Sequence, residues 1–357
     1  NSSKGRIQAM NELEKIIIIG GCGGIGTNLA THFIKKGFKV TSFDNLSSKF
    51  SKTNILKHKN YSFIEGDIKR KSDLKFNGDF VIHLASSDNY RDNISGDLNL
   101  IEYCKEKNIP LIFVSSNRIY SNLVNKIPFT EFTSRYVIGE KTGQYTKKGK
   151  PITESKVYNE GIDETFPIDG LDKYFKTLYG ASRYTGDMFT QEFSQLGLKA
   201  TILRTSFVYG KYQYTDWLSY FMIARLTGRD IEIQGSGKEV TDALYVDDFS
   251  ELMELIVTKF DNFEGKVFNI GGGHNPSFTV SKLEALNLID ILDQRAGFDN
   301  KPSKVKFTKG DESEHRIYLS DIRKIGEYWK PKTTVFSGFE KKYNWIYENI
   351  DFIKEAL

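Results

Sequence analysis

The chain has 357 residues, of which 39% are hydrophobic and 27% are charged, and its formal net charge is +4 at pH 7. This composition is ordinary for a globular protein and excludes a fibrous or disordered chain. Basic residues are dispersed along the sequence, so no nucleic acid partner is expected. The apolar run at 16–19 is far shorter than the ~20 residues that span a bilayer, so we expect no membrane partner and a cytoplasmic protein.

Two features of the chain carry no fold signal. Residues 1–10 have no apolar pattern and are expected to be a tag remnant or a disordered tail. Cys22 and Cys104 lack the spacing of zinc ligands or of a disulfide framework. Both thiols are therefore expected to be reduced, and no metal site is predicted.

Short β-branched or aromatic runs alternate with helical stretches through the first two thirds of the chain, which is typical of βαβ units around a buried parallel sheet. Strands are predicted at 15–20, 38–44, 61–67, 79–86, 110–116 and 199–206. Helices are predicted between them at 25–36, 96–107 and 179–196. The expected fold class is therefore α/β, a Rossmann-type doubly wound parallel sheet with a smaller C-terminal α/β lobe.

The change of pattern along the chain predicts two domains. The cofactor-binding domain is expected to comprise 11–203 plus 241–270, and the substrate lobe 204–240 plus 271–357. A long excursion at 121–172 interrupts the first domain without regular alternation. Loops of this length are usually functional or disordered.

The first predicted strand runs into the sequence Gly20-Gly-Cys-Gly23-Gly24-Ile25-Gly26, which leads directly into a helix. Glycines in this place let a dinucleotide pyrophosphate approach the N-terminus of the helix. A simple tight turn is the alternative interpretation. Asp44 ends the second strand, eighteen residues after Gly26, where a carboxylate accepts ribose hydroxyls and repels a 2′-phosphate, so NAD is favoured over NADP.

A possible catalytic pair lies at the start of a predicted helix, where Tyr179 and Arg183 are four residues apart and project from one face. With the glycine loop, the HLAS sequence at 83–86 and Ser116 beyond a strand, this order resembles the extended short-chain dehydrogenase/reductases, the NAD-dependent epimerase/dehydratases. The resemblance implies that Tyr179 is the acid/base for a sugar hydroxyl, that Ser116 orients it, and that Arg183 stands in for a lysine that binds nicotinamide ribose and stabilises the tyrosinate.

The same resemblance implies contacts around the cofactor beyond Tyr179 and Arg183. The expected NAD-binding residues are Gly20, Gly23, Gly24, Ile25, Gly26, Asp44, Asn45, Asp67, Ile68, Leu84 and Ala85. Asp67 follows the third strand and fits either an adenine contact or a helix N-cap.

Three segments, at 116–122, 159–170 and 312–325, are similar to the CDP-tyvelose (CDP-paratose) 2-epimerase subgroup. This similarity implies a homodimeric epimerase of a nucleotide sugar, first of all a CDP-hexose. Such an enzyme oxidises a carbinol carbon with NAD and returns the hydride to the other face of the keto-sugar. The implied substrate contacts are Asn117, Phe207, Thr241 and Arg316.

The sequence departs from the family pattern around this site. Arg183 replaces a lysine, Thr241 stands where relatives place a diphosphate-binding arginine, and Phe207 stands where many have a small polar residue. The segment between 86 and 93 is also shorter than in the family pattern, by roughly one helix turn or more. A dehydratase would need an Asp-Glu pair directly after Ser116, where this chain has Asn117 and Arg118. The alternatives are a reductase or dehydratase of the same family, and a catalytically silent NAD-binding regulator.

Overall fold

The computed structural model describes residues 14–139, 161–168, 177–297, 304–310 and 314–356. The predicted tail at 1–10 and much of the excursion at 121–172 lie outside these residues. Contacts group the chain into two units. Unit 1 comprises Asn1–Ser115, Ala181–Leu203 and Phe249–Val267, and unit 2 comprises Ser116–Gly180, Arg204–Asp248 and Phe268–Leu357. Residues 116–180, which we predicted with the cofactor-binding domain, group with unit 2.

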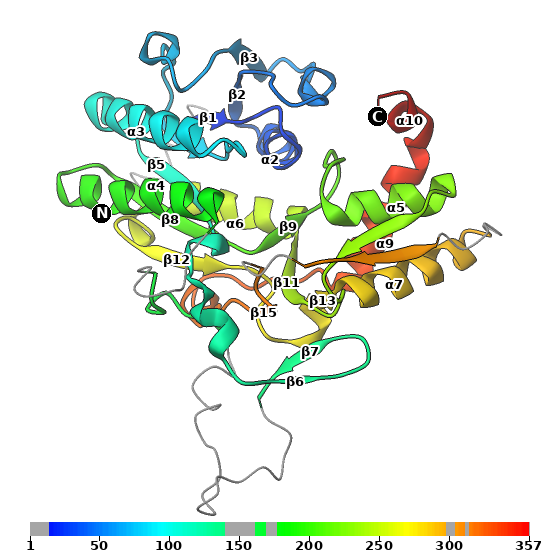
Figure 1. Ribbon diagram of the computed structural model, residues 1–357. Coiled ribbons are helices and arrows are strands. Elements are labelled where there is room, and N and C mark those ends of the chain that lie inside the picture. The colour runs from blue at the N-terminus through cyan, green and yellow to red at the C-terminus, as the bar shows by residue number, and fades with distance from the viewer. Residues whose placement is uncertain (1–13, 140–160, 169–176, 298–303, 311–313, 357) are drawn as a thin grey trace, which may run out of the picture. The chain divides into compact units, whose positions relative to one another are not determined.

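A seven-stranded sheet forms the main layer of the fold, in the order β12-β8-β5-β4-β1-β2-β3 (Figure 1). Its strands are β1 (Lys15–Ile19), β2 (Lys39–Asp44), β3 (Tyr61–Glu65), β4 (Phe80–His83), β5 (Leu111–Ser116), β8 (Ala200–Thr205) and β12 (Val267–Ile270). β1 pairs in parallel with β2 on one side and with β4 on the other. The predicted doubly wound α/β class is confirmed.

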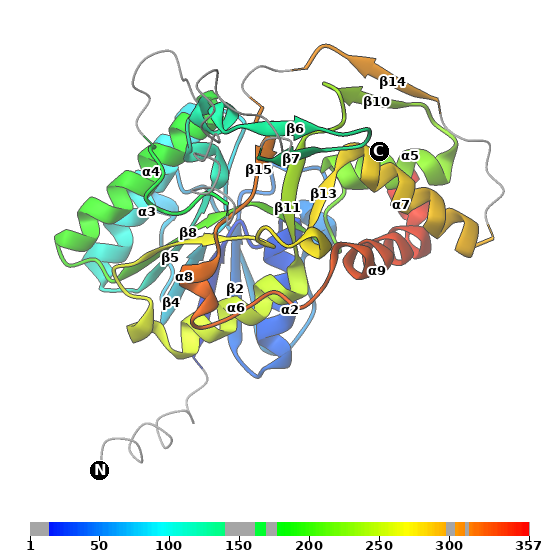
Figure 2. The same ribbon diagram turned by 90° about the horizontal axis from the view of Figure 1, so that it is seen from below.

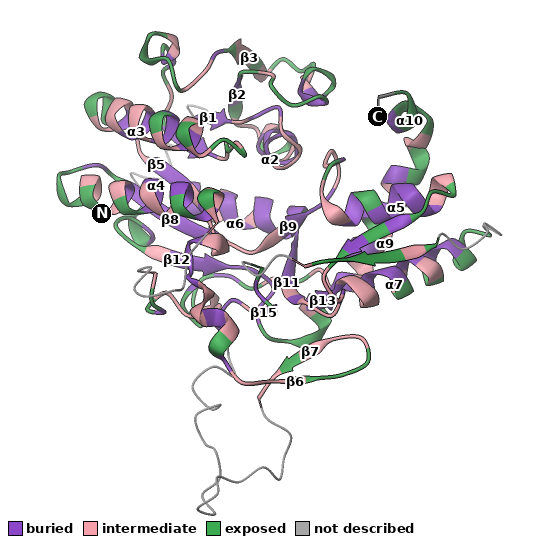
Figure 3. Ribbon diagram, viewed as in Figure 1, coloured by how far each residue is buried: buried purple, intermediate pink, exposed green. Residues whose placement is uncertain are grey.

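The central strands β1, β4 and β5 are buried along most of their length, because helices cover both faces of the sheet. Figure 2 shows α3 (Tyr90–Lys107) and α4 (Leu178–Gln195) on one face, and α2 (Gly24–Lys35) and α6 (Val246–Thr258) on the other. Burial is concentrated on the central strands (Figure 3). The core packed around them includes Ile17, Ile19, Val81, Leu100, Phe113 and Ile202.

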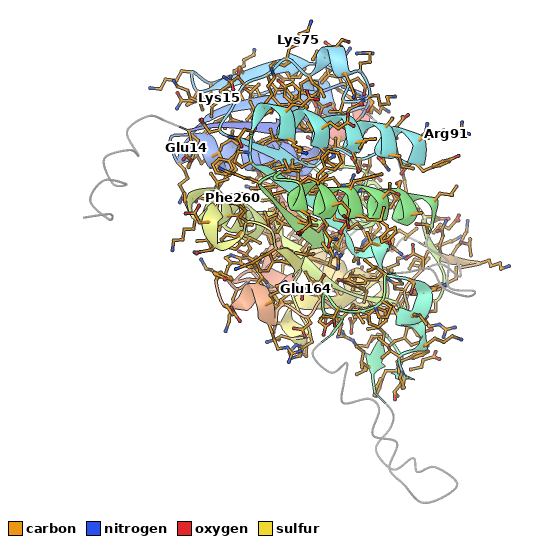
Figure 4. All side chains as sticks on the ribbon, turned by 90° about the vertical axis from the view of Figure 1, so that its left-hand side faces the viewer. Glu14, Lys15, Lys75, Arg91, Glu164 and Phe260 are labelled. Atoms are coloured by element: carbon orange, nitrogen blue, oxygen red, sulfur yellow. The ribbon has the colours of Figure 1, made fainter. Side chains whose placement is uncertain are left out.

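Helix α3 begins six residues earlier than the predicted 96. The Asn89 side chain accepts a hydrogen bond from the backbone N–H of Arg91 and caps the helix. The added turn is polar and lacks apolar periodicity, which is why the pattern missed it. Figure 4 shows Arg91 at this end of α3, pointing away from the protein. At the other end, Asn108 adopts a left-handed conformation, φ 53°, that stops the helix.

Unit 2 is built on short strands and a group of helices. Its strands are β6 (Phe129–Glu131), β7 (Tyr136–Ile138), β9 (Phe207–Tyr209), β10 (Ile231–Gln234), β11 (Val240–Tyr245), β13 (Thr279–Ser281), β14 (Val305–Thr308) and β15 (Ile317–Tyr318). Its helices include α5 (Trp217–Thr227), α7 (Lys282–Arg295), α8 (Arg323–Gly326), α9 (Val335–Glu348) and α10 (Ile350–Ala356). β11 is the centre of this unit because β9, β13 and β15 all pair with it.

Candidate active site

The glycine loop between β1 and α2 is too tightly packed for larger residues at several positions, among them Gly20 and Gly26. Gly20 has φ +77°, and a Cβ atom there would lie 2.8 Å from the backbone nitrogen of Ala85. A Cβ atom at Gly26 would lie 2.4 Å from the carbonyl oxygen of Gly20. Gly23 caps the helix, and its own Cβ position meets only the Gly20 oxygen, at 3.3 Å. The first N–H groups of α2 have no acceptor within the helix, so the loop fits a phosphate.

The Asp44 carboxylate lies against this loop. Its Oδ2 accepts a hydrogen bond from the backbone N–H of Cys22 at 3.0 Å, and its Oδ1 accepts one from Leu46 at 2.8 Å. Burial raises the pKa of Asp44, although both backbone donors act against this rise. A carboxylate oxygen has two lone pairs, so each oxygen can still accept a ribose hydroxyl. The loop and Asp44 together fit a dinucleotide.

The other predicted cofactor residues fall into two groups. Leu84 donates its backbone N–H to the carbonyl oxygen of Ile19 at 2.9 Å, and Ala85 packs against Gly20, so both border the glycine loop. Asp67 and Asn45 instead form local turns, in which they accept the backbone N–H groups of Lys69 and Ser47. The helix N-cap alternative for Asp67 is not observed, because the short helix that follows, Lys71–Asp73, has Arg70 at its N-cap position, and the adenine contact stays a prediction. Ile68 packs against Gly96 of α3.

The turn after β5 and the first turn of α4 lie together in unit 2. Ser116 Oγ accepts the backbone N–H of Arg118 at 3.1 Å and lies 3.4 Å from Asn117 Oδ1. A Cβ atom at Gly180 would lie 2.3 Å from the carbonyl oxygen of Arg118. This close approach brings the Ser116 turn next to the helical turn that carries Tyr179, whose side chain is partly exposed.

Arg183 lies one turn further along α4, and its guanidinium is buried in unit 1. Nη1 donates to both oxygens of Asp97, at 3.1 and 3.3 Å, and Nη2 donates to the carbonyl oxygen of Val114 at 2.6 Å. Nη1 also lies 3.4 Å from the Ala85 carbonyl oxygen, and the group stacks over Phe113 at 4.8 Å. Both terminal nitrogens therefore have protein acceptors, and the contact of Arg183 with nicotinamide ribose stays a prediction.

Asp97 is the residue that sequence reasoning missed. It accepts hydrogen bonds from Arg183 and lies 2.7 Å from His83 Nε2, and all three side chains are at most 3% exposed. Burial lowers the pKa of His83, so the imidazole is neutral beside the Asp97–Arg183 ion pair. The signal was an acidic residue on the buried stripe of α3, between Asn93 and Leu100.

Two of the predicted substrate residues, Phe207 and Thr241, lie on neighbouring strands of unit 2. Phe207 of β9 pairs in register with Ala243 of β11, and its ring stacks on Tyr209 at 5.5 Å. Thr241 of β11 lies 3.1 Å from the Ser206 hydroxyl. Arg316 directly precedes β15, and its guanidinium lies over Phe129 at 5.3 Å.

The fold is a doubly wound sheet. Its glycine loop fits a dinucleotide phosphate, and Asp44 lies at the end of β2. These features define a nucleotide-cofactor enzyme of the Rossmann type. The model of the NAD dependent epimerase/dehydratase family matches residues 16–147 and 155–271. The chain belongs to this family. The predictions of an NAD-dependent enzyme and of NAD as its cofactor are thereby confirmed.

Curated relatives match nearly the whole chain. CDP-paratose 2-epimerase of Salmonella typhi is 29% identical and covers 93% of this chain and 98% of its own length. dTDP-glucose 4,6-dehydratase of Salmonella typhimurium is 26% identical, with 96% of this chain and 95% of its own length covered. The resemblance to the CDP-paratose 2-epimerase subgroup is confirmed by the first of these matches.

Solved structures share the fold. dTDP-glucose 4,6-dehydratase of Bacillus anthracis, in complex with NAD, has a TM-score of 0.74 at 23% identity and covers 96% of this chain and 100% of its own. UDP-glucose 4-epimerase of Thermotoga maritima, with UDP-glucose, has a TM-score of 0.69 at 22% identity, with 94% and 99% covered. These similarities support the fold alone.

Neither a membrane-spanning helix nor a metal site is found among the described residues. Within the described ranges, no helix is long and apolar enough to cross a membrane. In the same part of the chain, no group of three or more His, Cys, Asp or Glu side chains could hold a metal ion. Both cysteines are buried thiols.

Proposed function

We propose that the protein is an NAD-dependent nucleotide-sugar epimerase whose first substrate to test is a CDP-hexose. The observation that carries this proposal is the packing of the Ser116 turn against the first turn of α4, which carries Tyr179. The similarity to CDP-paratose 2-epimerase over nearly the whole of both chains supports the CDP-hexose.

In this proposal Tyr179 takes the proton of the reacting sugar hydroxyl and later returns it, while Ser116 Oγ orients that hydroxyl. NAD, when bound at the glycine loop and Asp44, would supply both the hydride acceptor and the hydride donor, so no cofactor would be consumed. A phenol has a reference pKa near 10, so Tyr179 serves as a base only where positive charge stabilises the phenolate. The residues that would hold the dinucleotide are the glycine loop, Asp44, Leu84 and Ala85.

Arg183 takes a different part from the lysine that it replaces. Because its terminal nitrogens are held by Asp97, Val114 and Ala85, we assign it as a positioning residue. Its hydrogen bonds to Ala85 and Val114 link α4 to the chain at the ends of β4 and β5, where Ala85 borders the glycine loop. Asp97 partly neutralises the positive charge of Arg183, so Arg183 stabilises a Tyr179 phenolate less than an unpaired cation would.

Three other functions are alternatives, and a specific observation supports two of them, the dehydratase and the silent regulator. A dehydratase is supported by the dTDP-glucose 4,6-dehydratase relatives, but Asn117 and Arg118 occupy the places of its acid/base pair. A reductase would consume NADH in proportion to product. A silent NAD-binding regulator is supported by the engagement of Arg183 inside the protein, and it would convert no sugar.

The test is to incubate the purified protein with CDP-, UDP- and GDP-hexoses and to follow the sugar signals by NMR and NADH by absorbance. The proposal predicts a new epimer with no net change in NADH. Product formed with stoichiometric loss of NADH would indicate the reductase. Bound NAD with every sugar unchanged would favour the regulator. The homodimer and the cytoplasmic location are carried forward as predictions of the same proposal.

A further inference from the structure

Arg118 is a half-buried cation beside the proposed catalytic groups, and the chemistry above does not use it. Its backbone N–H donates to Ser116 Oγ at 3.1 Å. Its carbonyl oxygen lies against Gly180, the neighbour of Tyr179. The backbone of Arg118 therefore touches one proposed catalytic residue and the immediate neighbour of the other.

One terminal nitrogen of the Arg118 guanidinium is hydrogen-bonded, and the other is not. Nη2 donates to Glu314 Oε2 at 2.7 Å, whereas Nη1 is buried and has no hydrogen-bond partner among the described residues. A buried donor without an acceptor is costly, so its presence indicates a missing partner. Arg118 and Glu314 remain 30% and 46% exposed, and an ion pair of this exposure contributes little to stability. A role in folding alone does not account for the pair.

Two residues next to the Arg118–Glu314 pair are His315, which follows Glu314 in the chain, and Asn125, which contacts the Glu314 backbone. His315 is buried and stacks on Tyr318 at 5.6 Å. Burial and, to a smaller extent, the charge of Arg118 lower the pKa of His315 to about 3, so the imidazole is neutral at physiological pH. Asn125 donates to the carbonyl oxygen of Glu314 and accepts the N–H of Arg316, which fixes the segment that carries Glu314.

We infer that Arg118 is a specificity-determining residue, whose Nη1 donates a hydrogen bond to an oxygen of the glycosyl group of the substrate while Glu314 holds Nη2. The inference rests on the proposed function, because it requires the sugar to lie at Ser116 and Tyr179. Both contacts of the Arg118 backbone are on the side of the reacting sugar, so a sugar oxygen is favoured over the diphosphate. A guanidinium held on one side by a carboxylate is also a directional donor on the other.

The test compares two probes on the NAD-loaded full chain by calorimetry, CDP-glucose and CDP. A charge-assisted hydrogen bond predicts that Arg118→Ala raises the Kd for CDP-glucose about 10- to 100-fold. The Kd for CDP should stay within about twofold, since CDP has no sugar to bind. Arg118→Lys should recover part of the loss, and Arg229→Ala, which removes an exposed arginine of the same unit, should change neither Kd.

Three outcomes separate this inference from the proposed function. Equal losses for CDP and CDP-glucose in Arg118→Ala would overturn it, because the contact would then be to the nucleotide or would be structural. Unchanged binding of both probes would also overturn it. If wild type binds CDP-glucose with the predicted Arg118 dependence but forms no epimer from any hexose, the Arg118 contact is supported and the epimerase proposal fails.

Discussion

The buried Asp97–Arg183 pair allows a direct test of the role assigned to Arg183. Asp97→Asn keeps the shape of the side chain but leaves the guanidinium without a countercharge, in a site where both side chains are at most 3% exposed. Removal of one partner from a buried ion pair costs about 3–5 kcal/mol. We therefore expect the free energy of unfolding of the cofactor-free protein to fall by about this amount.

The assay is urea unfolding followed by fluorescence, with a matched control on the same helix. Asp92 of α3 pairs with Lys69 at 3.2 Å, but the two side chains are 33% and 38% exposed. Asp92→Asn should therefore cost no more than about 1 kcal/mol. Arg183→Met in the Asp97→Asn background should recover stability, because it removes the unpaired buried charge. Equal costs for Asp97→Asn and Asp92→Asn would refute the reasoning.

Three further predictions concern the catalytic tyrosine, the glycine loop and a buried histidine. Tyr179→Phe should lower kcat by about 10²- to 10⁴-fold, the usual contribution of an acid/base, while NAD stays bound; turnover equal to wild type would remove Tyr179 from the mechanism. Gly26→Ala should destabilise the cofactor-free protein and abolish NAD binding, because its Cβ would lie 2.4 Å from the Gly20 oxygen, whereas Gly23→Ala, with a 3.3 Å contact, should unfold at nearly the wild-type urea concentration. His315 has a folded pKa of about 3, below its unfolded value, so the unfolded state binds more protons, and stability should fall as pH drops from about 6.5 towards 3, by up to about 1.4 kcal/mol per unit. His315→Gln should flatten this slope, and an unchanged slope would show that other groups cause it.

Six of the seven strands of the main sheet were predicted because they are short runs rich in β-branched or aromatic residues that alternate with helical stretches. The predicted strand at 38–44 and the observed Lys39–Asp44 differ by one residue. β9 and β15 of unit 2 are different, since they have three and two residues and are defined by pairing with β11. Such pairing is long-range and leaves no local pattern to read.

The site was predictable where one short motif carries the geometry. The glycine loop with Asp44 needs only residues 20–44, and the structure brings them together as the spacing implied. The position of Arg183 depends on Asp97, which lies 86 residues away on a different helix. The sequence therefore shows that arginine replaces lysine at position 183. Its ion-pair partner, Asp97, is found only from the packing of α3 against α4.

The central claim is that a sugar carbon is oxidised and then reduced by the same hydride. The most direct measurement is the epimerisation of a CDP-hexose in D₂O, with the product examined by NMR at the inverted carbon. The account predicts an epimer that carries protium at that carbon, since the hydride never leaves the protein. Deuterium at the inverted carbon would contradict it, because the hydrogen would then have exchanged with solvent.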